Sequence, residues 1–185
     1  MIILLILLIL LSFGVLALAI NIIRLSQSGE MSKLVAFLDR FLNVIFILIG
    51  IAYLVGLIVT FISLSSYELG IILSIQLVVR AYFFYVIYVQ TKFLLSQLKG
   101  EIIFEKSNAV SVNKVGQAFL FMSAIEIIAG LLMGVFFLFT GSNPSFSIEF
   151  NIDQVILITI GFILIIVSLI YHKAIEIYEE NKLTI

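Results

Sequence analysis

Long apolar runs restrict the fold of this sequence more than any other feature. A helix that crosses a bilayer needs about 20 mostly apolar residues, and five segments meet that requirement: roughly 2–23, 41–63, 69–90, 115–139 and 154–171. Hydrophobic residues make up 63% of the chain and charged residues 11%, whereas a soluble domain carries about 25% charged residues. We therefore predict an all-α integral membrane bundle with five transmembrane helices.

The positions of the cations predict the orientation of this bundle. Apart from Arg80, all Lys and Arg residues fall in alternate connections or after the last apolar run: Arg24, Lys33, Arg40, Lys92, Lys99, Lys106, Lys114, Lys173 and Lys182. The connections 64–68 and 141–153 contain none. Because Lys and Arg near span ends gather on the cytoplasmic side, we expect the N-terminus outside and the C-terminus in the cytoplasm.

The first apolar run is predicted to be an N-terminal transmembrane anchor over residues 1–23, followed by a four-helix transmembrane domain over residues 24–185. The sequence "ALA" at residues 17–19 leaves a cleaved signal peptide open as an alternative. Signal peptides, however, begin with a positively charged region, and no cation precedes Arg24. A retained anchor is the interpretation that these residues favour.

On the predicted cytoplasmic side, the four-helix domain has a loop over residues 91–114 and a tail over residues 172–185. The third helix is expected to continue past the membrane to Leu98 and to end at Gly100, and Ser107 or Asn108 is expected to cap the next helix. The tail is expected to extend the last helix. The loop is either a simple connector or an interaction surface, and the residues leave both open.

Arg80 and Glu126 are the only charged residues inside the predicted spans. Each lies near the middle of its helix, and the two helices are consecutive and antiparallel. A charged residue at the centre of a membrane helix costs about 2.5–3.5 kcal/mol, and an uncompensated buried charge is strongly destabilising. We therefore predict that Arg80 and Glu126 face each other as an intramembrane charge pair.

The neighbours of the pair suggest protein contacts. Gln76 lies one helical turn from Arg80, and Ser123 lies one turn from Glu126. Gly130 and Gly134 continue the stripe of Glu126 at helical spacing, and their small-xxx-small pattern allows close helix approach. The stripe is therefore predicted to pack on a neighbouring helix.

The charge pair permits two functional readings. It is either a structural ion pair that sets the register of the two helices, or a functional site that switches the bundle or conducts ions or protons. No nucleophile–base set, phosphate-binding loop or metal motif is present, and the chain has no cysteine. We therefore expect a non-enzyme without cofactor or metal, either regulatory or adaptor in type or, alternatively, a small transporter or channel that uses Arg80 and Glu126.

Two cytoplasmic stretches carry a resemblance to a known family. "LKGEIIFEKSNAVSVNKVGQAFL" at residues 98–120 and "IYHKAIEIYEENKLTI" at residues 170–185 resemble the uncharacterised "domain of unknown function 2975" family of small bacterial multi-pass membrane proteins, over residues about 40–185. The residues offered as a cytoplasmic docking surface are Lys99, Gly100, Phe104, Asn108, Glu179 and Glu180.

The resemblance implies a location and a partner. It implies a multi-pass protein of the bacterial plasma membrane, in which the first span is an addition to the usual four. Members of the family are often encoded beside a helix-turn-helix regulator, which implies a cytoplasmic DNA-binding partner rather than direct contact with nucleic acid. A homo-oligomer in the lipid bilayer stays open.

Overall fold

The computed structural model describes residues 19–24, 26–27, 31–63, 67–100, 102–140 and 152–183. It contains the helices α2 (Met31–Ser63), α3 (Tyr67–Lys99), α4 (Lys106–Thr140) and α5 (Ile152–Leu183), and these described residues form no strand. The chain divides into two compact units, Met1–Phe41 and Leu42–Ile185, and each is described by itself.

Helices α2 to α5 are each long and apolar enough to cross a membrane. The predicted all-α class is confirmed, and the length and composition of the helices are consistent with a multi-pass membrane protein. The described residues contain four such helices, whereas five were predicted for the chain. The expected first span over residues 2–23 lies almost entirely outside the described residues, so the N-terminal anchor and the orientation of the bundle stay predictions.

The helix ends confirm one expectation and correct another. Helix α3 runs to Lys99 and α5 to Leu183, as expected for helices that continue past their apolar runs. Helix α4 already begins at Lys106, slightly before the caps expected at Ser107 or Asn108, so only residues 100–105 connect it to α3 and most of the region 91–114 is helical. Leu95 is buried, because the last turns of α3 bury apolar side chains instead of exposing a polar linker.

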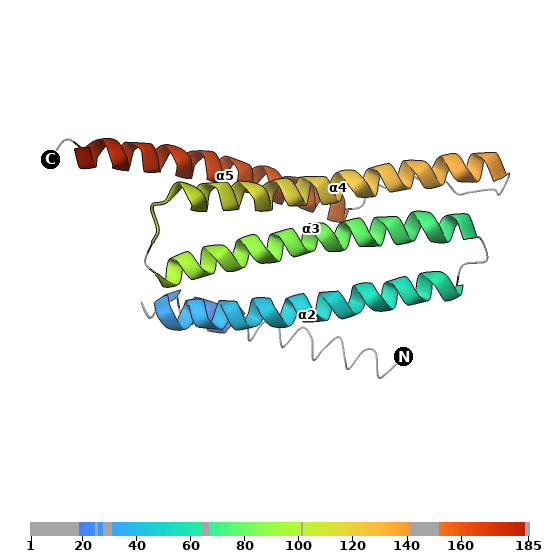
Figure 1. The fold of residues 1–185 in the computed structure, drawn as a ribbon, viewed down its shortest axis with the longest axis horizontal. Coiled ribbons are helices and arrows are strands. Elements are labelled where there is room, and N and C mark those ends of the chain that lie inside the picture. Colours follow the sequence, from blue (N-terminus) through green and yellow to red (C-terminus); the bar gives the residue numbers. More distant parts are fainter. Residues whose placement is uncertain are drawn as a thin grey trace. The chain divides into compact units, whose positions relative to one another are not determined.

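Helix α4 is the centre of the second unit, because it packs against both α3 and α5 (Figure 1). Most of the buried core therefore lies along α4, where the buried apolar residues are Ala109, Val115, Ala118, Met122 and Ala129. Large apolar side chains cover the outside, and Phe139 is 88% exposed. Such a surface suits a helix whose solvent is lipid, in which apolar side chains need no protein cover.

The part of α2 inside the second unit packs along α3 through aromatic rings. Phe46 stacks on Tyr88 with ring centroids 4.0 Å apart, and Tyr53 meets the edge of Phe84 at 6.2 Å. Rings of this size supply much contact area between helices. Helix α5 continues past the first turn of α4 at the end where the C-terminus is marked (Figure 1).

Candidate functional site

Arg80 of α3 and Glu126 of α4 meet in the middle of their helices. Arg80 Nη2 contacts Glu126 Oε1, and the two side chains are 32% and 10% exposed. Arg80 sits one turn from Phe83, whose ring stacks on Phe121 of α4 at 5.5 Å. The structure therefore brings together the two residues that were paired from their depth in the sequence, and what the pair does stays a prediction.

The polar neighbours lie around this pair in different surroundings. Ser123 is 1% exposed, and its Oγ has no hydrogen-bond partner among the described residues, as is also true of Arg80 Nε. Gln76 lines a cavity of about 230 Å³ between α3 and α4 together with Ala129. Neither Arg80 nor Glu126 lines this cavity. The Arg80 and Glu126 side chains therefore contact each other directly, and a small apolar cavity lies next to them.

The glycine stripe behaves differently from the prediction. Gly134 is buried, but Gly130 is exposed, and a Cβ added to Gly130 would have no described atom within 4 Å. The prediction that Gly130 packs on a helix is therefore wrong. Ala129, one residue earlier, is 6% exposed and lies on the packed face of α4 instead. The helical repeat of 3.6 residues per turn rotates Gly130 away from that face.

The close helix approach occurs instead between Gly116 of α4 and Gly161 of α5. A Cβ on Gly116 would lie 2.9 Å from the carbonyl oxygen of Gly161 and 2.9 Å from Ile165 Cγ1. A Cβ on Gly161 would lie 2.8 Å from Leu120 Cδ2. Ser168 Oγ donates a buried hydrogen bond of 2.7 Å to the Ala109 carbonyl nearby. The backbones can approach this closely only because both crossing residues lack a side chain.

The connection between α3 and α4 is held by side chains from two helices. Asn108 Nδ2 donates to the carbonyl oxygens of Ile102 at 2.9 Å and Ile103 at 3.0 Å, and the Tyr171 hydroxyl of α5 also donates to the Ile103 carbonyl. Asn108 lies inside α4, which begins at Lys106. Its side chain therefore organises the loop and does not cap the helix as was expected.

The predicted docking residues separate into an exposed group and a buried one. Phe104 is 53% exposed and stacks on Tyr178 at 5.1 Å, and Lys106 Nζ donates to Glu179 Oε2 at 3.0 Å. Lys99, Gly100 and Glu180 are also exposed. Asn108 is only 4% exposed, so its assignment to a docking surface is wrong, because its amide is used inside the protein.

A family model described as "Protein of unknown function (DUF2975)" matches residues 45–185. The chain belongs to the DUF2975 family. The match begins inside α2 and includes the charge pair, the loop and α5. No curated protein and no solved structure matches this DUF2975 protein.

Sequence reasoning missed two residues that organise the DUF2975 chain. Tyr171 holds the loop through the Ile103 carbonyl. Asn43 of α2 accepts hydrogen bonds from the Tyr88 hydroxyl at 2.8 Å and from Lys92 Nζ at 3.0 Å. Asn43 was detectable as a polar residue near the start of an apolar run, whereas the partner of Tyr171 is a backbone carbonyl that no side-chain pattern reveals.

The described residues of the DUF2975 protein contain no group of three or more His, Cys, Asp or Glu side chains that could hold a metal ion. His172 Nε2 lies 3.6 Å from Glu176 Oε1 on the same face of α5, and Lys173 Nζ donates to Glu176 Oε2 at 2.9 Å. These contacts form a solvated charge cluster along one helix.

Proposed function

We propose that this protein is a non-catalytic membrane adaptor or regulator, and that its cytoplasmic end docks a soluble partner. The observation that carries the proposal is a folded platform, formed by residues 102–106 and by α5 from Ile177 to Glu179. Phe104 stacks on Tyr178, and Lys106 pairs with Glu179. The connecting loop and the last helix therefore present one continuous surface.

The chemistry of the platform suits a protein partner. Its apolar side chains are about half exposed: Ile102 50%, Ile103 44%, Phe104 53%, Ile177 50% and Tyr178 50%. Charged groups of both signs, among them Lys106 and Glu179, stand beside them. Aromatic and aliphatic side chains ringed by polar ones are typical of protein-binding surfaces.

The platform lies at the end of the bundle where the sequence concentrates its cations. Lys99 ends α3 and Lys106 begins α4, and the positive-inside rule assigns such positions to the cytoplasm. The partner that we propose is a cytoplasmic DNA-binding regulator of the helix-turn-helix type, as the family resemblance implied. The bundle anchors that regulator at the bacterial plasma membrane, and the Arg80–Glu126 contact keeps α3 and α4 in register.

Cross-linking in the native membrane tests this proposal. The chain has no cysteine, so Ile177→Cys carries the only attachment point for a photoreactive cross-linker. We expect cross-links to a DNA-binding regulator, and we expect deletion of the protein to change transcription from that regulator's promoters. Recovery of no regulator, together with unchanged transcription, contradicts the proposal.

A matched pair of substitutions locates the surface. Phe104 and Phe139 are both exposed and lie near opposite ends of α4. We expect Phe104→Ala to reduce capture of the regulator severalfold, since an exposed aromatic anchor commonly contributes 1 kcal/mol or more, roughly a factor of five or above. Phe139→Ala is expected to leave capture unchanged. Equal losses in both variants place the docking surface elsewhere.

The alternative is a small transporter or channel that uses Arg80 and Glu126. A cavity of about 230 Å³ beside the pair, lined in part by Gln76, favours it. The measurement is ion or proton flux in liposomes, with Glu126→Gln as the variant. A flux that Glu126→Gln abolishes supports the alternative, whereas a flux that it leaves intact excludes this route.

A further inference from the structure

One face of α3 is left exposed among the described residues. The two sides next to it are packed, because Phe84 meets the ring edge of Tyr53 in α2 and Phe83 stacks on Phe121 of α4. The exposed side chains recur every three or four residues along the helix: Ile71, Ile75, Val78, Tyr82, Tyr85 and Val89. These six residues, called the outer face of α3, therefore form a narrow strip between two occupied sides of the helix.

Two tyrosines distinguish the outer face of α3 from the exposed surface of α2. Between Val44 and Ile62, the exposed side chains of α2 are all apolar. On the outer face of α3, Tyr82 is 61% exposed and Tyr85 is 53% exposed, and neither hydroxyl has a hydrogen-bond partner among the described residues. A helix surface that meets lipid alone needs no polar group, so lipid contact does not account for the two hydroxyls of α3.

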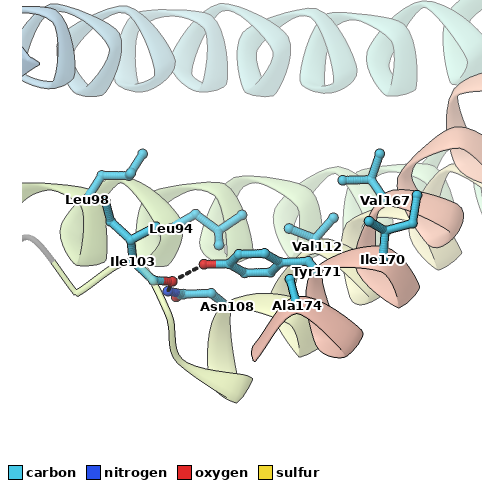
Figure 2. Close-up of a pocket in the computed structure, with 9 residues that line it drawn as sticks. All are labelled: Leu94, Leu98, Ile103, Asn108, Val112, Val167, Ile170, Tyr171 and Ala174. Carbon is cyan, nitrogen blue, oxygen red and sulfur yellow. Dashed lines mark hydrogen bonds between the residues drawn. The ribbon is translucent and has the colours of Figure 1, made fainter. Parts of the chain in front are cut away.

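Other hydroxyls of these helices find their partners inside the chain. Thr60 and Thr159 each donate to a carbonyl four residues earlier in their own helix. Tyr88 donates to a side chain of α2, and Tyr171 donates to the Ile103 carbonyl (Figure 2). A tyrosine hydroxyl stands at the far end of a ring and cannot reach back to its own helix as a threonine hydroxyl does. The hydroxyls of the outer face therefore need a partner from outside the described helices.

The depth of Tyr82 excludes water and lipid headgroups as that partner. Tyr82 follows Arg80 by two residues, roughly 3 Å along the helix, whereas the hydrocarbon core extends about 15 Å from the middle of the bilayer. With Arg80 near that middle, the lean of helical side chains toward the N-terminus points the Tyr82 ring toward the centre of the membrane. An unpaired hydroxyl in hydrocarbon is costly, so a protein group at the same depth is the partner that fits.

We propose that the outer face of α3 packs against the same face of a second copy of the chain. Both copies have one orientation in a membrane, so the two-fold axis runs along the membrane normal and each residue meets its own counterpart. A hydroxyl suits this meeting because it both donates and accepts a hydrogen bond, whereas a charge would meet its like. The six residues of the face carry no charge, and Lys92, the next position at this spacing, donates to Asn43 instead.

The spacing and the chemistry of the face agree with this arrangement. Alternating steps of three and four residues let two helices remain in contact over several turns at a small left-handed crossing angle. Close packing and hydrogen bonds between polar side chains are what hold helices together in lipid. The proposal does not depend on the adaptor role, because it concerns a face within the membrane and not the exposed platform.

Single-cysteine cross-linking of the full-length protein in liposomes tests the interface. The chain has no cysteine, so Val78→Cys forms a disulfide only between two copies. The matched variant is Ile51→Cys on α2, since Val78 is 57% exposed and Ile51 is 53% exposed. At a low protein-to-lipid ratio, with copper phenanthroline as the oxidant, we expect a cross-linked dimer from Val78→Cys and little from Ile51→Cys. Equal cross-linking in the two variants, or none in Val78→Cys, overturns the proposal.

A second measurement separates a dimer from cover by another part of the same chain. In a second copy's interface, reaction of Val78→Cys with a lipid-soluble maleimide is expected to rise as added lipid dilutes the protein and the dimer dissociates. Reaction that stays blocked in a protein shown to be monomeric means that the chain itself covers the face, and this result overturns the proposal.

The hydroxyl is tested apart from the ring that carries it. Tyr82→Phe keeps the apolar contact and removes the hydroxyl from both copies. We expect the dissociation constant of the dimer to rise about three- to twentyfold, the effect of one hydrogen bond between membrane helices. Energy transfer between donor- and acceptor-labelled copies, followed as lipid is added, measures that constant. A constant that Tyr82→Phe leaves unchanged overturns the assignment of Tyr82 to the two-fold contact.

Discussion

The two sides of α4 are held by opposite means. Toward α3, the contact is made by long side chains: Arg80 meets Glu126, and Phe83 stacks on Phe121. Toward α5, the contact is a close approach of the two backbones, which is possible because Gly116 and Gly161 have no side chains. The α3–α4 seam, which is the interface between those two helices, is specified by charge. The α4–α5 seam, the interface on the other side of α4, is specified by shape. Single substitutions should therefore destabilise the two interfaces in different ways.

The difference follows from the solvent. In lipid, apolar side chains gain little by leaving their surroundings, so helices associate through close packing and polar contacts. Charge holds the α3–α4 seam at one register, because moving either residue by a turn leaves a charge unpaired. Packing holds the α4–α5 seam, because dispersion contacts are small singly and large together. The charge pair therefore fixes the register of α3 against α4, and the close approach of the backbones strengthens the packing of α4 against α5.

Removing one charge should produce the largest effect. Glu126→Leu leaves Arg80 without its carboxylate, and we expect a loss of about 3–5 kcal/mol in the free energy of unfolding, the cost of breaking a buried pair. Detergent-induced unfolding in mixed micelles measures the loss. A loss below about 1 kcal/mol would show that Arg80 reaches a polar surface on its own, and that the seam does not depend on charge.

The double substitution separates charge from packing. Replacing both Arg80 and Glu126 by Leu removes the unpaired charge along with the pair. Since apolar replacement of a whole buried pair is often neutral or stabilising, we expect the double variant to regain most of the stability that Glu126→Leu loses. If the double variant stays as unstable as the single one, the helix contacts at these positions depend on side-chain shape and not on charge.

Crowding the glycine crossing should produce the next largest effect. In Gly116→Ala, the added methyl group lies 2.9 Å from a backbone oxygen of α5, so the helices must move apart. We expect a loss of about 1–3 kcal/mol, the usual cost of overpacking. The control is Gly130→Ala, which meets no described atom within 4 Å. Because alanine also favours helix over glycine, this control should be neutral or slightly stabilising.

The same contrast explains what the sequence revealed. Membrane length and apolar composition predicted helices α2 to α5, and the rarity of charge inside the spans predicted the Arg80–Glu126 contact, since two charges at equal depth have few other ways to be satisfied. Glycine carries no such information. Gly116, Gly130 and Gly161 look alike in the sequence, and only the rotation and crossing of the helices decide which of them is buried.

The end of the bundle that holds the α3–α4 loop shows a second limit of sequence reasoning. The connection over residues 91–114 is mostly helical, because α3 and α4 continue through it, close to the ends expected at Gly100 and at Ser107 or Asn108. Leu95 and Ala109 are buried there, so tertiary packing extends the helices beyond the membrane segments. Asn108 was predicted to be a cap or a docking residue, because its loop partners, the carbonyls of Ile102 and Ile103, carry no signal in the side-chain pattern.

Loss of the Tyr171 hydrogen bond to the loop between α3 and α4 should lower the stability less than a change at either seam. Tyr171→Phe removes one donor to the Ile103 carbonyl but leaves the Asn108 hydrogen bond to the same oxygen. We expect a loss of about 0.5–1.5 kcal/mol, the net value of one hydrogen bond. Amide hydrogen exchange of residues 102–105 should accelerate, while exchange at Gly116 stays unchanged. Faster exchange at both places would mean that the Tyr171 hydrogen bond also supports the α4–α5 seam.

The pair between Lys106 and Glu179 should produce the smallest effect, although it also joins α4 to the last helix. Both side chains are about half exposed, 53% and 54%, and an exposed ion pair contributes about 0–1 kcal/mol that salt screens further. We expect Lys106→Ala to lower the free energy of unfolding by less than about 1 kcal/mol at low salt. At high salt the difference should disappear. Glu126→Leu is the comparison, because its loss arises in the bundle interior and should persist in salt. A salt-resistant loss in Lys106→Ala would mean that the pair is desolvated in the membrane, and that charge contributes to both seams of α4.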